Sequence, residues 1–286
     1  MVRALLFGWA RANHPSHLHY AWDLECAPSL DFAILETTRQ AVALLDLGGI
    51  ERPHLFEPGC GIGGGVTQVA AMLPAATVTG LSLVERQLEI GRAMANRRKL
   101  QNIDLVHGNY LSTPFPDAHF DGIFAIECLV YAPIAEKVAL CRELFRILRP
   151  GRTFVSFEPS RLRDPRDETE RKLIQNVLDG WTMPLPPTAV EFQSAACEAG
   201  FELTRCEDAT THVHESARRI AAIARRVLAP LAGIARVPLV GNVVVPLGFQ
   251  SLRHAQRFLQ ACLSQVGVFE AGLGAYYVHV FRKPAS

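Results

Sequence analysis

The stretch HLFEPGCGIGGG, residues 54–65, constrains the fold more than any other part of the sequence. It has the pattern of a short apolar strand, a turn rich in glycine and the beginning of a helix. Gly59, Gly61 and Gly64 fit the dinucleotide spacing G-x-G-x-x-G, whereas Gly59, Gly61 and Gly63 fit the tighter spacing G-x-G-x-G. The spacing alone therefore leaves two kinds of ligand open.

Strands and helices are predicted to alternate around this turn. We expect strands over 54–58, 77–83, 103–109, 120–127 and 153–159, and helices over 29–47, 64–73, 84–100 and 135–148. Such alternation is typical of parallel strands joined by crossover helices, so the predicted fold class is α/β with a doubly wound, mostly parallel sheet. Ligands of such a sheet bind beyond the carboxyl ends of the strands, near the switch point after the first strand.

Beyond residue 159 the alternation loosens. We expect a charged connection over 160–172, helices around 174–178 and 188–199, a strand over 201–210, a helical region from about 214 to 265 and a strand over 275–284. Two late strands that bracket helices predict an antiparallel edge on the sheet and a helical cap. The expected parts are a helical covering segment (1–48), a ligand-binding core (49–211), a cap that forms an acceptor lid (212–270) and a last core strand (271–286).

Composition excludes several classes of function. The net charge of +1 argues against nucleic acid as a partner. The seven cysteines are scattered without a C-x-x-C pair, which predicts neither a disulfide framework nor a metal site and favours a cytoplasmic protein. The longest apolar stretch, 237–250, is interrupted by proline and glycine and is shorter than the roughly 20 residues of a membrane-spanning helix. We expect it to form a hydrophobic wall.

The charges around the glycine turn separate the two ligand classes. A dinucleotide site needs an acid about 20 residues after the turn, yet the second strand ends in Gly80-Leu-Ser82-Leu, and the next acid is Glu85, inside the following helix. Glu57 would place a negative charge beside any phosphate, but it suits a ligand that carries a cationic amine. S-adenosylmethionine has an ammonium and a sulfonium and no phosphate. Gly64 and Gly65 are then expected to give backbone freedom at the helix start.

Four segments in order resemble class I S-adenosylmethionine-dependent methyltransferases. They are FEPGCGIGG (56–64), HGNYLSTPFPDAHFDGIFAIE (107–127), CRELFRILRPGRTFV (141–155) and CEAGFEL (197–203). LHYAWDLECAPSLDFA (18–33) and GLSLVERQ (80–87) are similar to the small-molecule subgroup that acts on natural products, terpenoids, tocopherols and sterols. The place where protein and RNA methyltransferases carry an N/D-P-P-Y motif reads IECLVYAP (126–133). The resemblance implies a Rossmann-like methyltransferase sheet with S-adenosyl-L-methionine as cofactor.

The resemblance also implies roles for individual residues. The glycines at 59, 61 and 63 would let the backbone approach the methionine portion, and Glu57 would orient its ammonium. Ser82 and Gln87 match the ribose region, and Asn109 matches the position beside the adenine amino group. The whole implied cofactor set is Tyr20, Glu57, Gly59, Cys60, Gly61, Gly63, Ser82, Leu83, Gln87, Asn109, Tyr110 and Ile126.

Glu127 is the predicted catalytic carboxylate. The pattern from Glu127 to Tyr131 resembles the E-S-x-x-Y stretch of prenyl-diphosphate C-methyltransferases, in which the Glu faces the carbocation that forms on methyl addition. A carboxylate in an apolar environment can stabilise a developing cation or take a proton. The alternative is an acid that stabilises a helix N-terminus. His19, inside the LHYAW segment, is a further catalytic candidate.

The acceptor is expected to be a small hydrophobic or aromatic molecule. Its candidate contacts are Trp22, Leu129, Trp181, Tyr276, Tyr277 and the apolar wall. Arginines around 161–166 and 218–226 could grip an anion, although nearby acids favour a solvated face.

Several functions remain open at this level, among them a remote NAD-dependent enzyme. The expected function is C-methylation of an isoprenoid, sterol-like or indole-like compound. N- or O-methylation of a secondary metabolite and a non-catalytic cofactor-binding partner subunit are the alternatives, and a homo-oligomer stays open.

Overall fold

The structure is a computed structural model of the 286-residue chain, and it describes residues 17, 19–228 and 251–285. The chain divides into two compact units. The sheet unit consists of Leu35–Ser160, Pro186–Ala209 and Tyr276–Ser286, and the helical unit consists of Met1–Ile34, Arg161–Leu185 and Thr210–Ala275. The expected apolar wall at 237–249 lies outside the described residues, as does most of the first half of the expected covering segment.

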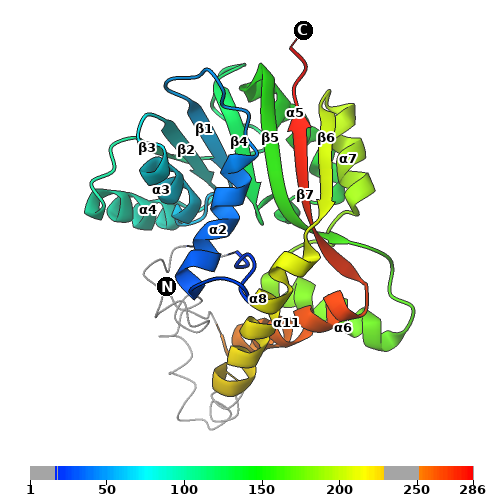
Figure 1. The fold of residues 1–286 in the computed structure, drawn as a ribbon. Helices are drawn as coiled ribbons and strands as arrows, with labels where there is room; N and C mark the ends of the chain where they lie inside the picture. Colours follow the sequence, from blue (N-terminus) through cyan, green and yellow to red (C-terminus); the bar gives the residue numbers. More distant parts are fainter. Residues whose placement is uncertain (1–16, 18, 229–250, 286) are drawn as a thin grey trace. The chain divides into compact units, whose positions relative to one another are not determined.

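Seven strands form one sheet in the order β3-β2-β1-β4-β5-β7-β6 (Figure 1). They are β1 (His54–Pro58), β2 (Thr77–Ser82), β3 (Ile103–His107), β4 (Phe120–Ile126), β5 (Leu148–Arg161), β6 (Glu202–Asp208) and β7 (Gly274–Arg282). Strands β1 to β5 pair in parallel, and β6 pairs antiparallel with β7. The parallel sheet with an antiparallel edge, expected from the sequence, is therefore confirmed. Because β1 lies between β2 and β4, the switch point follows β1.

Helices flank this sheet as the alternation predicts. They are α2 (Leu30–Ala43), which begins in the helical unit, α3 (Gly64–Met72), α4 (Glu85–Arg97), α5 (Lys137–Ile147) and α7 (Ala189–Glu198). Thr188 caps α7 in a capping box with Glu191, which fixes the start of that helix. Within the sheet unit, α3 packs on α4 and α5 packs on α7. Phe56, Phe120 and Phe154 are fully buried in the core between strands and helices.

The strand boundaries that differ from the sequence prediction include the start of β5 and the end of β4. Strand β5 begins at Leu148, before the expected start at residue 153, because Phe120 pairs with Leu148. The register shifts between this pair and the pair of Gly122 with Thr153, and the extra residues lie on β5. Strand β4 ends at Ile126, so Glu127 lies just outside the strand in the left-handed region, at φ 51°. A short 3-10 turn, η2 (Leu129–Tyr131), follows.

The helical unit contains α6 (Glu168–Trp181), α8 (Thr210–Ile223), the π-helical turn η4 (Ala224–Leu228) and α11 (Leu252–Glu270). Helix α11 packs on α6 and on α8. Helix α6 begins at Glu168, inside the expected charged connection, because the Asp167 side chain accepts the N–H of Glu170 and caps the helix. None of the helices in the described ranges is long and apolar enough to cross a membrane.

Candidate functional site

The carboxyl ends of four parallel strands bring the sequence-predicted cofactor residues of the sheet unit to one edge. Pro58 of β1 pairs with Leu81 of β2, and Ser82 pairs with His107 of β3. On the other side of β1, Ile126 at the end of β4 pairs with Phe157 of β5. The residues that follow these strands, including the glycine turn, therefore lie at the same edge of the sheet.

The glycine turn uses its glycines for different physical reasons. Gly59, Gly61 and Gly63 have φ angles of 64°, 55° and 78°, which side chains rarely adopt. A β-carbon on Gly59 would lie 2.7 Å from Cβ of Cys128, so the approach of the segment after β4 also requires glycine there. A β-carbon on Gly61 would meet no atom within 4 Å. Gly61 is thus the glycine of this turn that faces open space.

Glu57 is a buried carboxyl group beneath this turn, with 7% of the residue exposed. It accepts a hydrogen bond from the N–H of Val66 in the first turn of α3, and its Oε2 has no hydrogen-bond partner among the described residues. Burial raises the pKa of Glu57 from 4.5 to about 8, and the Val66 N–H opposes that rise. A buried carboxyl oxygen without a partner fits a site that receives a cationic group.

Gly65 has a different role from the one expected. It was predicted to supply backbone freedom, but it has no positive φ angle, and a β-carbon there would lie 2.7 Å from Glu57 Oε2. The glycine therefore makes room for the Glu57 carboxyl group.

The residues expected on the ribose side lie close together. Ser82 is buried, and its hydroxyl donates to Gln87 Oε1 over 2.8 Å while accepting the N–H of Val84 over 3.2 Å. Leu83 between them is 61% exposed. The hydrogen bond from Ser82 to Gln87 fixes the turn between β2 and α4. Ser82 stands at the end of β2, where a dinucleotide site would carry an acid.

The residues expected beside the adenine lie in the first part of the loop between β3 and β4. Asn109 is exposed, and its Oδ1 accepts the N–H of Leu111 over 2.9 Å, which closes a local turn. Tyr110 packs partly buried against the core, and burial raises the pKa of its hydroxyl. Asn109 keeps a second lone pair on Oδ1 for a ligand, because an amide oxygen has two.

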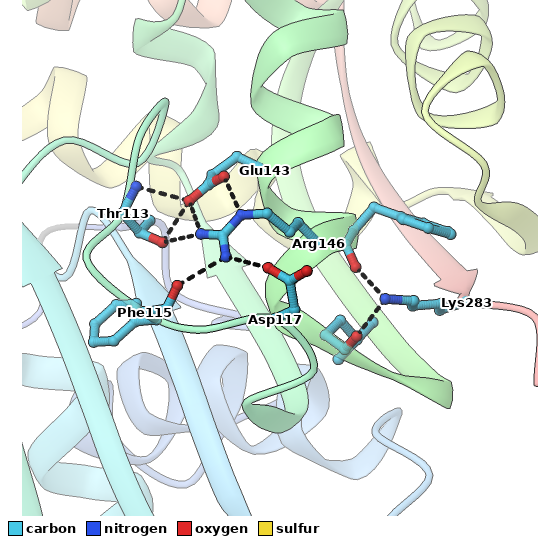
Figure 2. A network of polar contacts seen from close by, with 8 residues as sticks. Thr113, Phe115, Asp117, Glu143, Arg146 and Lys283 are labelled. Atoms are coloured by element: carbon cyan, nitrogen blue, oxygen red, sulfur yellow. Dashed lines mark hydrogen bonds and ion pairs between the residues drawn. The ribbon is translucent and has the colours of Figure 1, made fainter.

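Arg146 of α5 fixes this loop through a polar network that the sequence did not reveal (Figure 2). Its guanidinium donates to Glu143 over 2.7 and 2.9 Å, to Asp117 over 2.7 Å and to the Phe115 carbonyl over 2.8 Å. The Thr113 N–H and hydroxyl donate to the same Glu143 over 2.7 and 2.5 Å. The loop that carries Asn109 and Tyr110 is thereby held on α5.

Glu127 lies at the carboxyl end of β4, partly exposed, where the fold places reacting groups. Its N–H donates to the Phe157 carbonyl over 2.9 Å. The Tyr276 hydroxyl of β7 donates to Glu127 Oε1 over 3.0 Å. Tyr276, which the sequence predicted as a substrate contact, is fully buried and contacts Glu127 from the interior of the protein.

Glu158, near the carboxyl end of β5, is a second carboxylate at this edge, and it was not among the residues predicted from the sequence. It is buried and accepts the backbone N–H groups of Cys128, Leu129 and Val130 over 3.0, 2.8 and 3.1 Å. A signal was available, because the triplet Phe-Glu-Pro occurs twice, at 56–58 and at 157–159, each time near the end of a predicted strand. The acid of each triplet is buried and accepts backbone hydrogen bonds, one from Val66 for Glu57 and three for Glu158.

The other candidates in the sheet unit occupy varied environments. Cys60 is buried, and its N–H donates to the Leu81 carbonyl over 2.9 Å. Leu129 is buried in the core, whereas Tyr131 is 43% exposed. Tyr277 is partly buried on β7, opposite Asp208, with its ring 5.8 Å from that of His279.

Four candidates belong to the helical unit. The Tyr20 hydroxyl donates to Gln265 over 2.6 Å, and the Trp22 ring stacks on His212 at 4.4 Å. Trp181 meets Phe258 edge-on at 5.2 Å. His19 is buried, and burial lowers its pKa to about 4, which keeps its ring neutral at pH 7.

Three of the arginines that could have gripped an anion have acidic partners. Arg161 donates to Asp164 over 2.6 Å, and Arg163 contacts Glu170 over 2.7 Å. Arg218 lies within 4.0 Å of Glu215 and 3.6 Å of Glu270. These pairs agree with the charge-balanced face expected from the sequence. For Arg166, Arg219, Arg225 and Arg226, binding of an anion stays a prediction.

The chain has relatives of known name and of known structure. Residues 56–151 match the family model described as methyltransferase domain. The 24-methylenesterol C-methyltransferase 3 of Arabidopsis thaliana is 32% identical over 54% of this chain and 43% of its own length. The sterol 24-C-methyltransferase of Pneumocystis carinii is 28% identical over 63% of this chain and 49% of its own length. The chain spans about half the length of these curated relatives.

Solved structures share the fold at low identity. The geranyl diphosphate C-methyltransferase from Streptomyces coelicolor, solved with S-adenosyl-L-homocysteine, superposes with a TM-score of 0.69 at 14% identity, over 93% of this chain and 88% of that chain. The cyclase SpnF superposes with a TM-score of 0.73 at 21% identity, over 100% of this chain and 93% of that chain. The match over residues 56–151 shows that this chain contains a methyltransferase domain, and its fold is shared with these solved structures.

Proposed function

We propose that the protein binds S-adenosylmethionine at the edge formed by β1, β2 and β4 and transfers its methyl group to a carbon of an isoprenoid or sterol-like acceptor. The observation that carries the cofactor assignment is the buried Glu57 carboxyl group with an unpartnered oxygen beside a glycine turn. Similarity to sterol C-methyltransferases supports carbon as the methylated atom.

The residues at this edge fit the parts of that cofactor. Glu57 would hold the ammonium, the open space at Gly61 would admit the methionine portion, and Ser82 with Gln87 would contact the ribose hydroxyls. The Asn109 side-chain oxygen would accept a hydrogen bond from the adenine amino group. A sulfonium supplies an already activated methyl group, so these residues contribute mainly by orienting it and excluding water.

Glu127 would act on the acceptor. Methyl addition to an alkene carbon leaves a positive charge on the neighbouring carbon, and a fixed carboxylate stabilises that charge. The same carboxylate can then accept the proton whose loss restores the alkene. Both roles require the charged side chain to be held in one orientation.

The test uses S-adenosylmethionine with a deuterated methyl group, incubated with the protein and separate pools of sterols, prenyl diphosphates and aromatic acceptors. Mass spectrometry then identifies any product that carries the heavy methyl group. Gly61→Arg should abolish binding of S-adenosylhomocysteine, because the new side chain fills the open space of the turn and strains its left-handed backbone. Glu127→Gln should leave this binding unchanged within twofold and lower turnover at least hundredfold.

The outcomes separate the remaining alternatives. If the heavy methyl group is found on a nitrogen or oxygen atom of the product, the protein is an N- or O-methyltransferase and the proposal of C-methylation is wrong. Cofactor binding with label on none of the acceptor pools would favour a partner subunit or a different reaction on the same fold. Unaltered S-adenosylhomocysteine binding in Gly61→Arg would overturn the cofactor site itself.

A further inference from the structure

We propose that Glu158 and Tyr276 are positioning residues that together fix the orientation of Glu127. The inference rests on the methyl transfer proposed above, because it assigns both residues a role through Glu127. Its starting point is the backbone of Glu127, which has φ 51° although glutamate has no local means of favouring this left-handed conformation. Such a conformation persists only where the surroundings hold it.

Glu158 holds the chain immediately after Glu127. Its Oε1 accepts the N–H groups of Cys128 and Leu129, and its Oε2 accepts that of Val130, so both oxygens are engaged by three consecutive peptides. These donors open the turn η2, where backbone N–H groups have no partner within the turn. Hydrogen bonds to a charged carboxylate are stronger than those to a neutral group, so this segment is firmly anchored.

Lys137 completes the anchor from the other side. Its buried ammonium donates to the Leu129 carbonyl. Burial lowers the pKa of Lys137 and raises that of Glu158, and each group's charge opposes the shift of the other. The Leu129 peptide is therefore held at its N–H by Glu158 and at its carbonyl by Lys137.

Tyr276 fixes the Glu127 side chain itself. The buried hydroxyl lies 3.0 Å from Glu127 Oε1 and 3.4 Å from the Phe157 carbonyl, and a hydroxyl has one proton to donate. The shorter contact is to the carboxylate, which is also the stronger acceptor. Glu127 is thus oriented through its backbone by Glu158 and through its side chain by Tyr276.

The two carboxylates at this edge have separate tasks. Glu158 is 5% exposed and has both oxygens engaged by backbone N–H groups. Glu127 is partly exposed at the strand end. The exposed carboxylate is the one placed to meet an acceptor, and the buried one determines where that carboxylate lies.

The first experiment examines the anchor without requiring an acceptor. Glu158→Gln replaces one acceptor oxygen by an amide donor that faces backbone N–H groups. Hydrogen exchange of the Cys128, Leu129 and Val130 amides should accelerate at least tenfold, while the Kd for S-adenosylhomocysteine stays within twofold. Glu202→Gln, at an exposed site on β6, is the matched control and should change neither quantity. If the exchange rates of these three amides are unchanged in Glu158→Gln, the proposal that Glu158 anchors this segment is wrong.

The second experiment asks whether both residues act through Glu127. Tyr276→Phe and Glu158→Gln should each lower kcat about tenfold in the wild-type background and less than twofold in Glu127→Gln, measured on the residual turnover with methyl-labelled cofactor. A merely structural role would lower kcat equally in both backgrounds and would overturn the inference. A wild-type protein that labels no acceptor overturns the proposed function first. An active wild type with additive effects overturns this inference alone.

Discussion

The Glu57 carboxyl group occupies the space that a side chain on Gly65, the second residue of α3, would fill. A β-carbon on Gly65 would lie 2.7 Å from Glu57 Oε2, closer than such atoms approach in proteins. The pair explains why a helix start carries a glycine at a position with no positive φ angle. It also makes Gly65 a sensitive test of the role of Glu57.

Gly65→Ala is expected to impair cofactor binding more than folding. The added methyl group displaces the Glu57 carboxyl group at a cost of about 1 to 3 kcal/mol, while alanine recovers about 1 kcal/mol of helix propensity. The Kd for S-adenosylhomocysteine should rise at least tenfold, measured by isothermal titration calorimetry. Gly48→Ala is the control, because its nearest neighbour, Asp46 Oδ1, would be 3.7 Å away. Equal affinities in both variants would contradict this role of Gly65.

The pKa of Glu57 makes cofactor binding depend on pH. Burial raises this pKa from 4.5 to about 8, so the folded protein favours the protonated carboxyl group at neutral pH and loses stability as pH rises from 4.5 to about 8. An ammonium ligand binds the ionised form. Affinity for S-adenosylhomocysteine should therefore rise from pH 6 to pH 8, by up to about tenfold per pH unit.

Calorimetry can isolate this ionisation. At pH 7 the binding enthalpy should change with the ionisation enthalpy of the buffer, because binding releases close to one proton. Methylthioadenosine, which lacks the amino acid portion, should show neither the pH trend nor the proton release. Glu57→Gln should remove both effects, and a trend that persists in this variant would assign the ionisation to another group.

Sequence reasoning located the glycine turn and Glu57 because all of their determinants are local. Strand, turn and helix lie within twelve residues, and the charge of Glu57 is apparent from its place before the turn. The reason for Gly65 was missed because it depends on the packing of a side chain eight positions earlier. Glu158 was missed because its partners lie about 30 residues away and are backbone N–H groups, which no residue type reveals.

Long-range contacts also determine the conformation of Glu127 and the environment of Trp22. The position of Glu127 at a strand end was predicted, but its left-handed backbone follows from tertiary contacts. Trp22 was a candidate acceptor contact, and its stacking on His212, 190 positions along the chain, could not be read from a local pattern. Helix and strand positions follow from periodicity, whereas these partnerships follow from the folded core.

Arg146 should stabilise both the fold and the cofactor site, because its network fixes the loop that carries Asn109 (Figure 2). Arg146→Met leaves the largely buried Glu143 without its guanidinium partner, so we expect a loss of about 2 kcal/mol in the free energy of unfolding. Binding of S-adenosylhomocysteine should weaken severalfold. Urea denaturation and calorimetry measure the two effects.

Arg142 provides a matched control on the same helix. It pairs with Glu198 over 3.0 Å, but both side chains are about 60% exposed, and exposed ion pairs contribute little. Arg142→Met should change the free energy of unfolding by less than about 0.5 kcal/mol and leave cofactor affinity unchanged. Similar losses in both variants would contradict the anchoring role of Arg146.

His279 should make the protein sensitive to acid. The residue is fully buried on β7 beside Phe192 and Phe281, and neither ring nitrogen has a hydrogen-bond partner among the described residues. Burial lowers its pKa from 6.5 to about 4, so the folded protein resists a proton that the unfolded chain accepts below pH 6.5. The contribution of the neutral His279 ring to the free energy of unfolding is complete above pH 6.5. It declines as pH falls toward 4, by about 2 kcal/mol between pH 7.5 and pH 5.

Urea unfolding measures the free energy of unfolding at these two pH values. The difference between the two should be smaller in His279→Leu than in the wild type, whereas His254→Gln should retain the full difference. An acid sensitivity that is unchanged in His279→Leu would show that other groups cause it.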